Sequence, residues 1–218
     1  SLTGNVVDYF HGPTPWVEMI GQYPDLDFLA VATPDHLHFE PTWHALTNDI
    51  HVILEKPMTL QMTEADKIIE LANERELVVG LDMHKRYDPD HCKIFHDLVH
   101  QMGSPIYGRA VLEEPLEVST TTFKWASKSD PFSYVGVHWT DLFIHYLKTK
   151  PASLFAVGQK MKLCQQYGID AYDAVQVSVV FDNKMHVQFI NNWIMPSDFE
   201  GPVNQESELL LTNGKVES

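Results

Sequence analysis

A lysine whose backbone direction is fixed follows an apolar stretch in the first third of the chain. Lys56 lies between Glu55 and Pro57, directly after residues 51–54, an apolar run of the length typical of a buried strand. Pro57 fixes its own φ and favours an extended backbone at Lys56. At the carboxyl ends of the strands, where an open α/β sheet binds ligands, a partly desolvated ammonium has its pKa moved toward neutrality and can exchange protons. We therefore predict a proton-handling role for Lys56; the alternative is an ordinary surface lysine.

A second candidate segment is residues 134–148, which we expect to form a helix. On a helix His138, Asp141 and His145 fall at i, i+3 and i+7 and share one face, while much of the remaining surface is apolar. An aspartate four residues before a histidine can support and orient the imidazole, as a proton acceptor requires. The stripe predicts a polar cleft along a mostly buried helix; the alternative is a core histidine with a capping aspartate.

The elements that position Lys56 alternate between helix and strand. Thr14-Pro15 and Thr63 give the start signals of two helices, a capping residue in both and a proline at the first helical position in one. The expected order is helix 14–23, strand 27–32, helix 39–48, strand 51–54, helix 63–75 and strand 77–81. This alternation is the signature of a parallel sheet built from βαβ units.

The second half of the chain changes to longer, alternating strands. We expect a helix around 90–101, a strand at 106–112, the helix at 134–148, a hairpin of strands 175–181 and 185–190, and a strand with an Asn-Gly turn at 208–218. Such alternation indicates an antiparallel sheet with one covered face. The fold class is predicted as α/β plus α+β, with a partial, Rossmann-like parallel sheet in residues 1–87 and a large, mostly antiparallel open sheet in residues 88–218.

The broad second sheet has two faces to cover. Val175, Val177, Val179 and Phe181 fall on the same face of one strand. We expect helices to cover one face of this sheet and a second copy of the chain to cover the other. A homodimer or homotetramer formed through the C-terminal sheet is therefore predicted.

Charge and cysteine content exclude several classes of protein. The chain has 15 basic and 30 acidic residues, a net charge of −15 and no basic stripe, which argues against binding of nucleic acid. Cys92 and Cys164 lie far apart and form no CxxC motif, so we expect reduced thiols and a cytoplasmic location. No apolar run approaches the roughly 18 residues of a membrane span. We expect no membrane association.

Histidine spacing raises a metal site as another possibility. His36 and His38 have ligand-like spacing on an expected strand, and His138, Asp141 and His145 could supply more ligands. Two-residue spacing is weak evidence in a chain with 12 histidines, and no cysteine joins these residues. We expect no metal.

Taken together, these segments resemble the Gfo/Idh/MocA family, the glucose–fructose oxidoreductase and inositol dehydrogenase family of NAD(P)-dependent enzymes that act on sugars and polyols. The resemblance covers the chain from about residue 14 to its end. It rests on Ala32-Thr33-Pro34 followed by His38, on Glu55-Lys56-Pro57, on Asp141-x-x-x-His145, and on His84-Lys85-Arg86-Tyr87-Asp88-Pro89. In the last of these motifs His84 stands where the family usually has Asn, and Val137 departs from the usual glycine pair that begins here with Gly136.

The resemblance implies an enzyme that transfers hydride between NAD or NADP and a secondary alcohol of a sugar, sugar derivative or cyclitol. It implies that Lys56 and His145 handle the proton of the substrate hydroxyl and that Asp141 orients the site. The cofactor-binding residues that it implies are Thr33, Pro34, His38, Glu55, Lys56, His84 and Trp125. The substrate-binding residues that it implies are Lys56, Arg86, His138, Asp141 and His145. For Trp125, a place in the core or in an interface is the alternative.

One expected feature of this family is not found in the sequence. A glycine-rich turn of the G-x-G-x-x-G type should lie roughly 60 or more residues before Lys56, and it would cradle the pyrophosphate. Gly12 and Gly21 are isolated and read as turn residues. We therefore expect an incomplete copy of a longer protein, without the first βαβ unit and cut at its C-terminal end. The alternatives are a non-catalytic sugar-binding or scaffold relative without cofactor binding, and a His/Asp metal hydrolase.

Overall fold

The computed structural model describes residues 8–218, which form two compact units. One unit ends at Asp82 and the other begins at Met83, five residues before the boundary expected from the sequence. The segment from His84 to Tyr87 therefore belongs to the second unit. None of the helices within residues 8–218 is long and apolar enough to cross a membrane.

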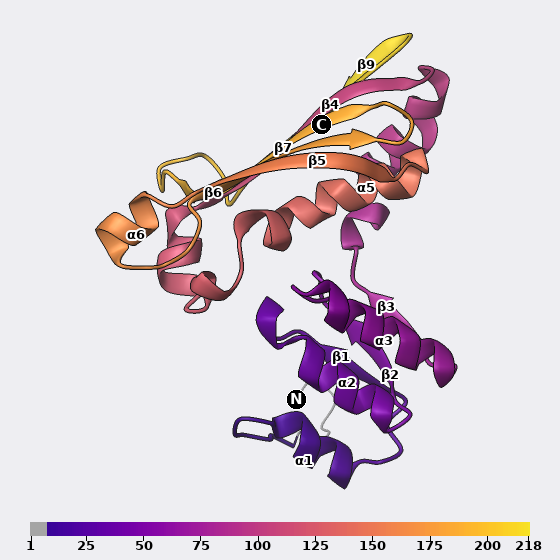
Figure 1. The fold of residues 1–218 in the computed structure, drawn as a ribbon, viewed down its shortest axis with the longest axis vertical. Helices are drawn as coiled ribbons and strands as arrows, with labels where there is room; N and C mark the ends of the chain where they lie inside the picture. Colours follow the sequence, from indigo (N-terminus) through magenta and orange to yellow (C-terminus); the bar gives the residue numbers. More distant parts are fainter. Residues whose placement is uncertain (1–7) are drawn as a thin grey trace. The chain divides into compact units, whose positions relative to one another are not determined.

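The first unit is a three-stranded parallel sheet with helices between its strands (Figure 1). The strand order is β1-β2-β3. The elements are α1 (Pro15–Gln22), β1 (Phe28–Val31), η1 (Asp35–Leu37), α2 (Phe39–Thr47), β2 (His51–Leu54), α3 (Met62–Glu74) and β3 (Val79–Leu81). These bounds confirm the predicted βαβ alternation. His36 lies in the short 3-10 turn η1, so the expectation that it is part of a strand was wrong.

Alternating burial along β1 and β2 explains how this sheet forms. Leu29, Val31, Val52 and Leu54 point to one face, where they pack with apolar side chains of all three helices. On the opposite face Phe28 and Ile53 stay about half exposed in this unit. Only one face of the small parallel sheet is therefore packed within the described part of the unit.

The second unit is built on a six-stranded sheet of order β5-β6-β7-β4-β8-β9. Four of its five strand pairs are antiparallel, and β4 with β7 is the parallel pair. The strands are β4 (Pro105–Pro115), β5 (Pro151–Gln159), β6 (Ala174–Phe181), β7 (His186–Met195), β8 (Asn204–Leu211) and β9 (Gly214–Glu217). The mixed, mostly antiparallel sheet and both hairpins of the sequence analysis are confirmed.

The helical segments of the second unit are less regular than the sequence indicated. They are η2 (His84–Tyr87), α4 (Pro89–His91), η3 (Cys92–Leu98), η4 (Val99–Gln101), η5 (Val118–Thr122), η6 (Ala126–Lys128), η7 (Phe132–Gly136), α5 (Val137–Leu147) and α6 (Lys162–Tyr167). The helix expected around 90–101 contains a π-helical stretch, and so does the start of the helix expected at 134–148.

The helix α5 lies against one face of the large sheet (Figure 1), and the hydrophobic core of the second unit lies between the helix and this face. Trp139, Leu142 and Phe143 are fully buried there and pack with Val177 and Phe189 of the sheet. The predicted apolar face of β6 is thus the helix-covered face. The outer face is mixed, with polar residues such as Ser178 beside exposed apolar residues of β5.

Candidate active site

The three parallel strands of the first unit end at the same edge of the sheet. Val31 pairs with Leu54, and Leu54 pairs with Leu81. Just beyond these pairs, the backbone N–H of Glu55 donates to Val31 O at 3.0 Å and that of Asp82 donates to Leu54 O at 2.8 Å. The loops that carry Thr33, Lys56 and Asp82 therefore begin side by side, at the edge where open α/β sheets bind ligands.

Lys56 is buried at this edge. Its exposed fraction is 8%, and the peptide bond to Pro57 is cis. The backbone N–H of Lys56 donates to Glu55 Oε2 at 3.2 Å. Lysine is rarely so buried unless it has a role or a partner, so the alternative of an ordinary surface lysine is wrong.

His38 is also buried, with an exposed fraction of 1%. Its Nδ1 lies 2.6 Å from the carbonyl oxygen of Pro57, and its Nε2 lies 2.8 Å from that of Thr33. Both ring nitrogens are thus occupied by backbone. No ring nitrogen is left to bind a ligand, and the expectation that this side chain lines the cofactor stays a prediction.

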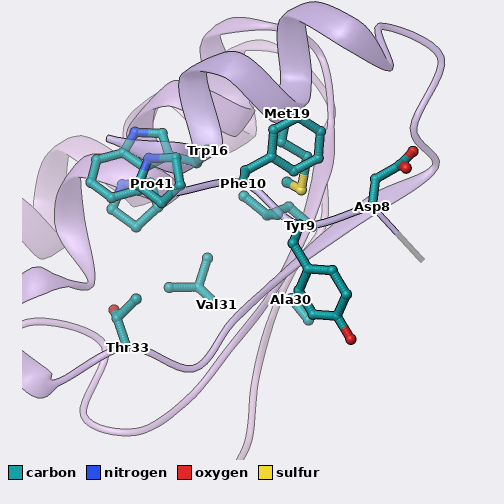
Figure 2. Close-up of a pocket in the computed structure, with 11 residues that line it drawn as sticks. Asp8, Tyr9, Phe10, Trp16, Met19, Ala30, Val31, Thr33 and Pro41 are labelled. Atoms are coloured by element: carbon teal, nitrogen blue, oxygen red, sulfur yellow. The ribbon is translucent and has the colours of Figure 1, made fainter. Parts of the chain in front are cut away.

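A pocket of about 320 Å³ lies beside β1 (Figure 2). Its lining is largely apolar and includes Trp16 and Met19 of α1 and Val31 of β1. Thr33 also lines it, and the Oγ1 atom of Thr33 is buried without a hydrogen-bond partner within residues 8–218. A buried hydroxyl of this kind is costly unless a partner satisfies it. The largely apolar lining of the pocket fits a flat, mostly apolar ring.

In the second unit Asp141 is held by Arg86. The guanidinium Nε donates to Asp141 Oδ2 at 2.7 Å, and Nη2 donates to Oδ1. This bidentate pair, with most of Asp141 buried, raises the pKa of Arg86. Both carboxylate oxygens are therefore used by Arg86. The carboxylate is bound to Arg86 of η2, so the expected direct support of His145 by Asp141 stays a prediction.

His145 lies on α5 one turn after Asp141. Its ring makes no hydrogen bond within residues 8–218 of the structure. Desolvation by burial lowers the pKa of His145, the positive charges of Arg86 and Lys148 lower it further, and the Asp141 carboxylate opposes them. The imidazole is therefore neutral at pH 7 and has a nitrogen that can accept a proton.

The other residues implied by the resemblance lie in different surroundings. The rings of His84 and His138 meet edge to face at 4.8 Å, with His84 exposed and His138 buried. Trp125 stacks on Phe123 with ring centroids 4.4 Å apart and lies against Tyr134. His84 and Trp125 remain accessible to a ligand, whereas His138 is largely covered.

Two residues of these sites were missed by the sequence analysis. Asp82 directly follows the third parallel strand, and a polar residue after that apolar run was a signal that could have been used. Tyr146 donates its hydroxyl to the carbonyl oxygen of Arg86 at 2.7 Å, and burial raises the pKa of Tyr146 to about 12. No sequence signal links Tyr146 to a loop 60 residues away.

Within the described residues, no group of three or more His, Cys, Asp or Glu side chains could hold a metal ion. The two histidines at positions 36 and 38 do not converge, because His36 is exposed and His38 faces the backbone.

The parallel βαβ sheet with polar loops at its carboxyl edge defines a Rossmann-type nucleotide-binding unit, here followed by an α+β unit. Residues 6–83 match a family model described as an oxidoreductase family with an NAD-binding Rossmann fold. This match supports the assignment of the chain to the Gfo/Idh/MocA family of oxidoreductases.

Two enzymes that act on sugars are similar to the chain in sequence. UDP-N-acetylglucosamine 3-dehydrogenase of Acidithiobacillus ferrooxidans is 37% identical over 62% of the chain and 40% of its own length. 1,5-Anhydro-D-fructose reductase of Ensifer adhaerens is 27% identical over 79% of the chain and 52% of its own length.

The crystal structure of an inositol dehydrogenase homologue of Azotobacter vinelandii, complexed with NADH and myo-inositol, superposes with a TM-score of 0.82. The two sequences are 16% identical, and the superposed region covers 93% of this chain and 54% of the homologue's chain. At this identity the likeness shows the fold alone. The chain spans about half of the length of these three relatives.

Proposed function

We propose that the protein carrying this chain is an NAD(P)-dependent oxidoreductase that interconverts a secondary alcohol and a ketone on a sugar, sugar derivative or cyclitol. The observation that carries the proposal is the buried Lys56 at the carboxyl edge of a parallel sheet, in a chain of the Gfo/Idh/MocA family. The names of the relatives support the substrate class, because they describe a nucleotide sugar, an anhydro sugar and an inositol.

The residues at the sheet edge fit the ring end of a nicotinamide cofactor. The largely apolar pocket beside β1, which Thr33 helps to line, suits a flat ring. We assign Thr33, Pro34, Glu55 and Lys56 of the first unit to this end of the cofactor, and His84 and Trp125 of the second unit to further contacts. When bound, the cofactor supplies the hydride acceptor or donor.

His145 has the properties of the proton acceptor for the substrate hydroxyl. Its lowered pKa keeps the ring neutral at pH 7, so that a nitrogen lone pair is available. Asp141 acts on His145 through Arg86 and by charge, since the carboxylate is bound to the guanidinium. In the direction of alcohol oxidation, His145 takes the proton as the carbon–oxygen bond gains carbonyl character.

Lys56 supplies positive charge for the same reaction. An ammonium held in a desolvated loop stabilises negative charge that develops on the substrate oxygen more strongly than it would in water. In this proposal Lys56 stabilises the negative charge on the oxygen of the substrate hydroxyl, and His145 accepts the proton of that hydroxyl.

Arg86 and His138 are the remaining substrate contacts that we propose. A guanidinium has five N–H donors, and Arg86 uses one on Nε and one on Nη2 to bind Asp141. The remaining donors suit the hydroxyl groups of a polyol. His138 lies against His84, on the same face of α5 as Asp141.

We also propose that the large sheet of the second unit joins two or four copies of the chain. Phe155 is 70% exposed on the outer face of the edge strand β5, and Val157 is exposed on the same face. Exposed apolar side chains of this size favour contact with another surface.

We also propose that the protein is located in the cytoplasm.

Replacement of Lys56 tests the proposed function. Lys56→Met keeps the length of the side chain and removes its charge, so we expect kcat to fall about 10²–10⁴-fold while the fold persists. The measurement is the absorbance of NADH or NADPH formed from a panel of sugars and cyclitols, with circular dichroism as the control for folding. Met62→Ala is a matched control, because Met62 is largely exposed at the start of α3.

A folded Lys56→Met variant with nearly normal turnover would show that the role of Lys56 is wrong. The double variant Lys56→Met/His145→Asn tells whether the two residues act on the same step. If they do, the decreases in kcat of the two single variants do not add in the double variant.

A further inference from the structure

His38 joins the two loops that follow β1 and β2. Thr33, whose carbonyl oxygen lies 2.8 Å from Nε2, belongs to the first loop. Pro57, whose carbonyl oxygen lies 2.6 Å from Nδ1, directly follows Lys56 in the second loop. One buried side chain is thus bonded to the backbone on both sides of the proposed site.

The two contacts tie the ring to backbone groups of both loops. Carbonyl oxygens accept hydrogen bonds and donate none, so the donor of each bond belongs to the ring of His38.

We propose that His38 is a positioning residue that fixes the loop carrying Lys56 against the loop carrying Thr33. The inference about catalysis rests on the proposed function, whereas the link between the loops does not. His38 touches neither substrate nor cofactor in this proposal, because its ring is buried and both nitrogens are used.

The ring is well placed to act as a fixed support. His38 precedes the first residue of α2, and Ala45 and Leu46 of the same helix are fully buried in the core of the first unit. The ring therefore extends from a helix that is held in place by packing. The ionisable groups beside the two bonds along the chain are Asp35 in the preceding turn, and Glu55 and Lys56 next to Pro57.

The link is tested by His38→Phe, which keeps a ring of similar size and removes both donors. We expect the amide hydrogen of Glu55 to exchange faster, because its bond to Val31 O lies beside the released loop. We also expect kcat to fall about 10- to 100-fold, because a small displacement of a catalytic group costs that much, while KM for the substrate changes little. Thr42→Val is the matched control, since Thr42 is buried on the same helix and its hydroxyl has no partner within residues 8–218.

The outcomes separate this proposal from the proposed function. A folded His38→Phe variant with unchanged Glu55 exchange and unchanged kcat would overturn the positioning role. If His38→Phe does not fold, His38→Gln, which keeps one donor group, is measured in the same way and is expected to give a smaller loss. If the unmodified protein shows no turnover, the proposed function fails, and the exchange of the Glu55 amide hydrogen still decides whether His38 links the loops.

Discussion

At the scale of single residues, burial and the neighbouring charges together lower the proton affinity of His145. Arg86 and Lys148 lower the pKa of His145 in addition to burial, and Asp141 opposes them. Arg86 is therefore both the partner of Asp141 and a cation that keeps His145 neutral. Removing the guanidinium would leave Asp141 as an uncompensated negative charge one turn from the imidazole.

We predict that Arg86→Gln raises the pKa of His145. The measurement is an NMR titration of the His145 ring, which needs no activity. Lys148→Met is the comparison, and we expect a smaller rise because Lys148 lowers the pKa of His145 less than Arg86 does. In the active protein the acid limb of kcat/KM would move to higher pH in Arg86→Gln. A titration of His145 that is the same in both variants and in the unmodified protein would contradict this account.

The sign of the effect on stability follows from the lowered pKa. The unfolded chain, whose histidines titrate near the ordinary value of about 6.5, binds the proton more tightly than the folded chain does. The contribution of His145 to the free energy of unfolding is therefore fully present above about pH 6.5. It is lost as the pH falls from there through the lower pKa of the folded state.

The sequence placed some of these residues and missed their partners. Helical spacing was enough to put His138, Asp141 and His145 on α5. The partner of Asp141 is 55 residues away along the chain, and a pattern read within one helix cannot identify it. The role of His38 was missed for the same reason, because it depends on two carbonyl groups in separate loops.

At the scale of elements, α6 depends on one buried carboxylate. Asp173 is 3% exposed and accepts the backbone N–H groups of Met161, Lys162 and Leu163 at 2.6, 2.7 and 2.8 Å. A helix of six residues is too short to be stable by itself. The bonds to Asp173 satisfy N–H groups at the start of the helix that have no partner within it.

We predict that Asp173→Ala lowers the free energy of unfolding by about 2–3 kcal/mol, because buried donors lose a charged acceptor. Chemical denaturation measures the change. Asp170→Ala is the matched control, since Asp170 pairs with Lys160 in solvent and such pairs contribute at most about 1 kcal/mol. Equal stabilities of the two variants would show that Asp173 does not hold α6.

The elements that the sequence did not predict lack the usual patterns. The edge strand β5 is exposed along nearly its whole length, so it shows no alternation of buried and exposed residues. The helix α6 is too short to show a period and depends on Asp173, which follows it in the chain. The strands and helices of the first unit were predictable because apolar residues recur at regular spacing along the buried side of each element.

At the scale of the whole molecule, the chain combines a parallel nucleotide-binding sheet with a large mixed sheet, as its sequence predicted. The match of residues 6–83 supports the family, and the superposition with the inositol dehydrogenase homologue shows the fold. The substrate was not predictable, because the side chains that would select it lie in loops whose positions depend on tertiary contacts.

The most direct test of the central claim is binding of NADH and NADPH to the full-length gene product. Energy transfer from tryptophan to the reduced nicotinamide reports on binding, and Trp16 lines the pocket beside Thr33. We predict saturable nicotinamide emission with at least one of the two cofactors, and a weaker transfer in Trp16→Phe while binding persists. The absence of saturable emission with both cofactors, with no change in tryptophan fluorescence, would contradict the assignment of this protein as a nicotinamide-dependent oxidoreductase.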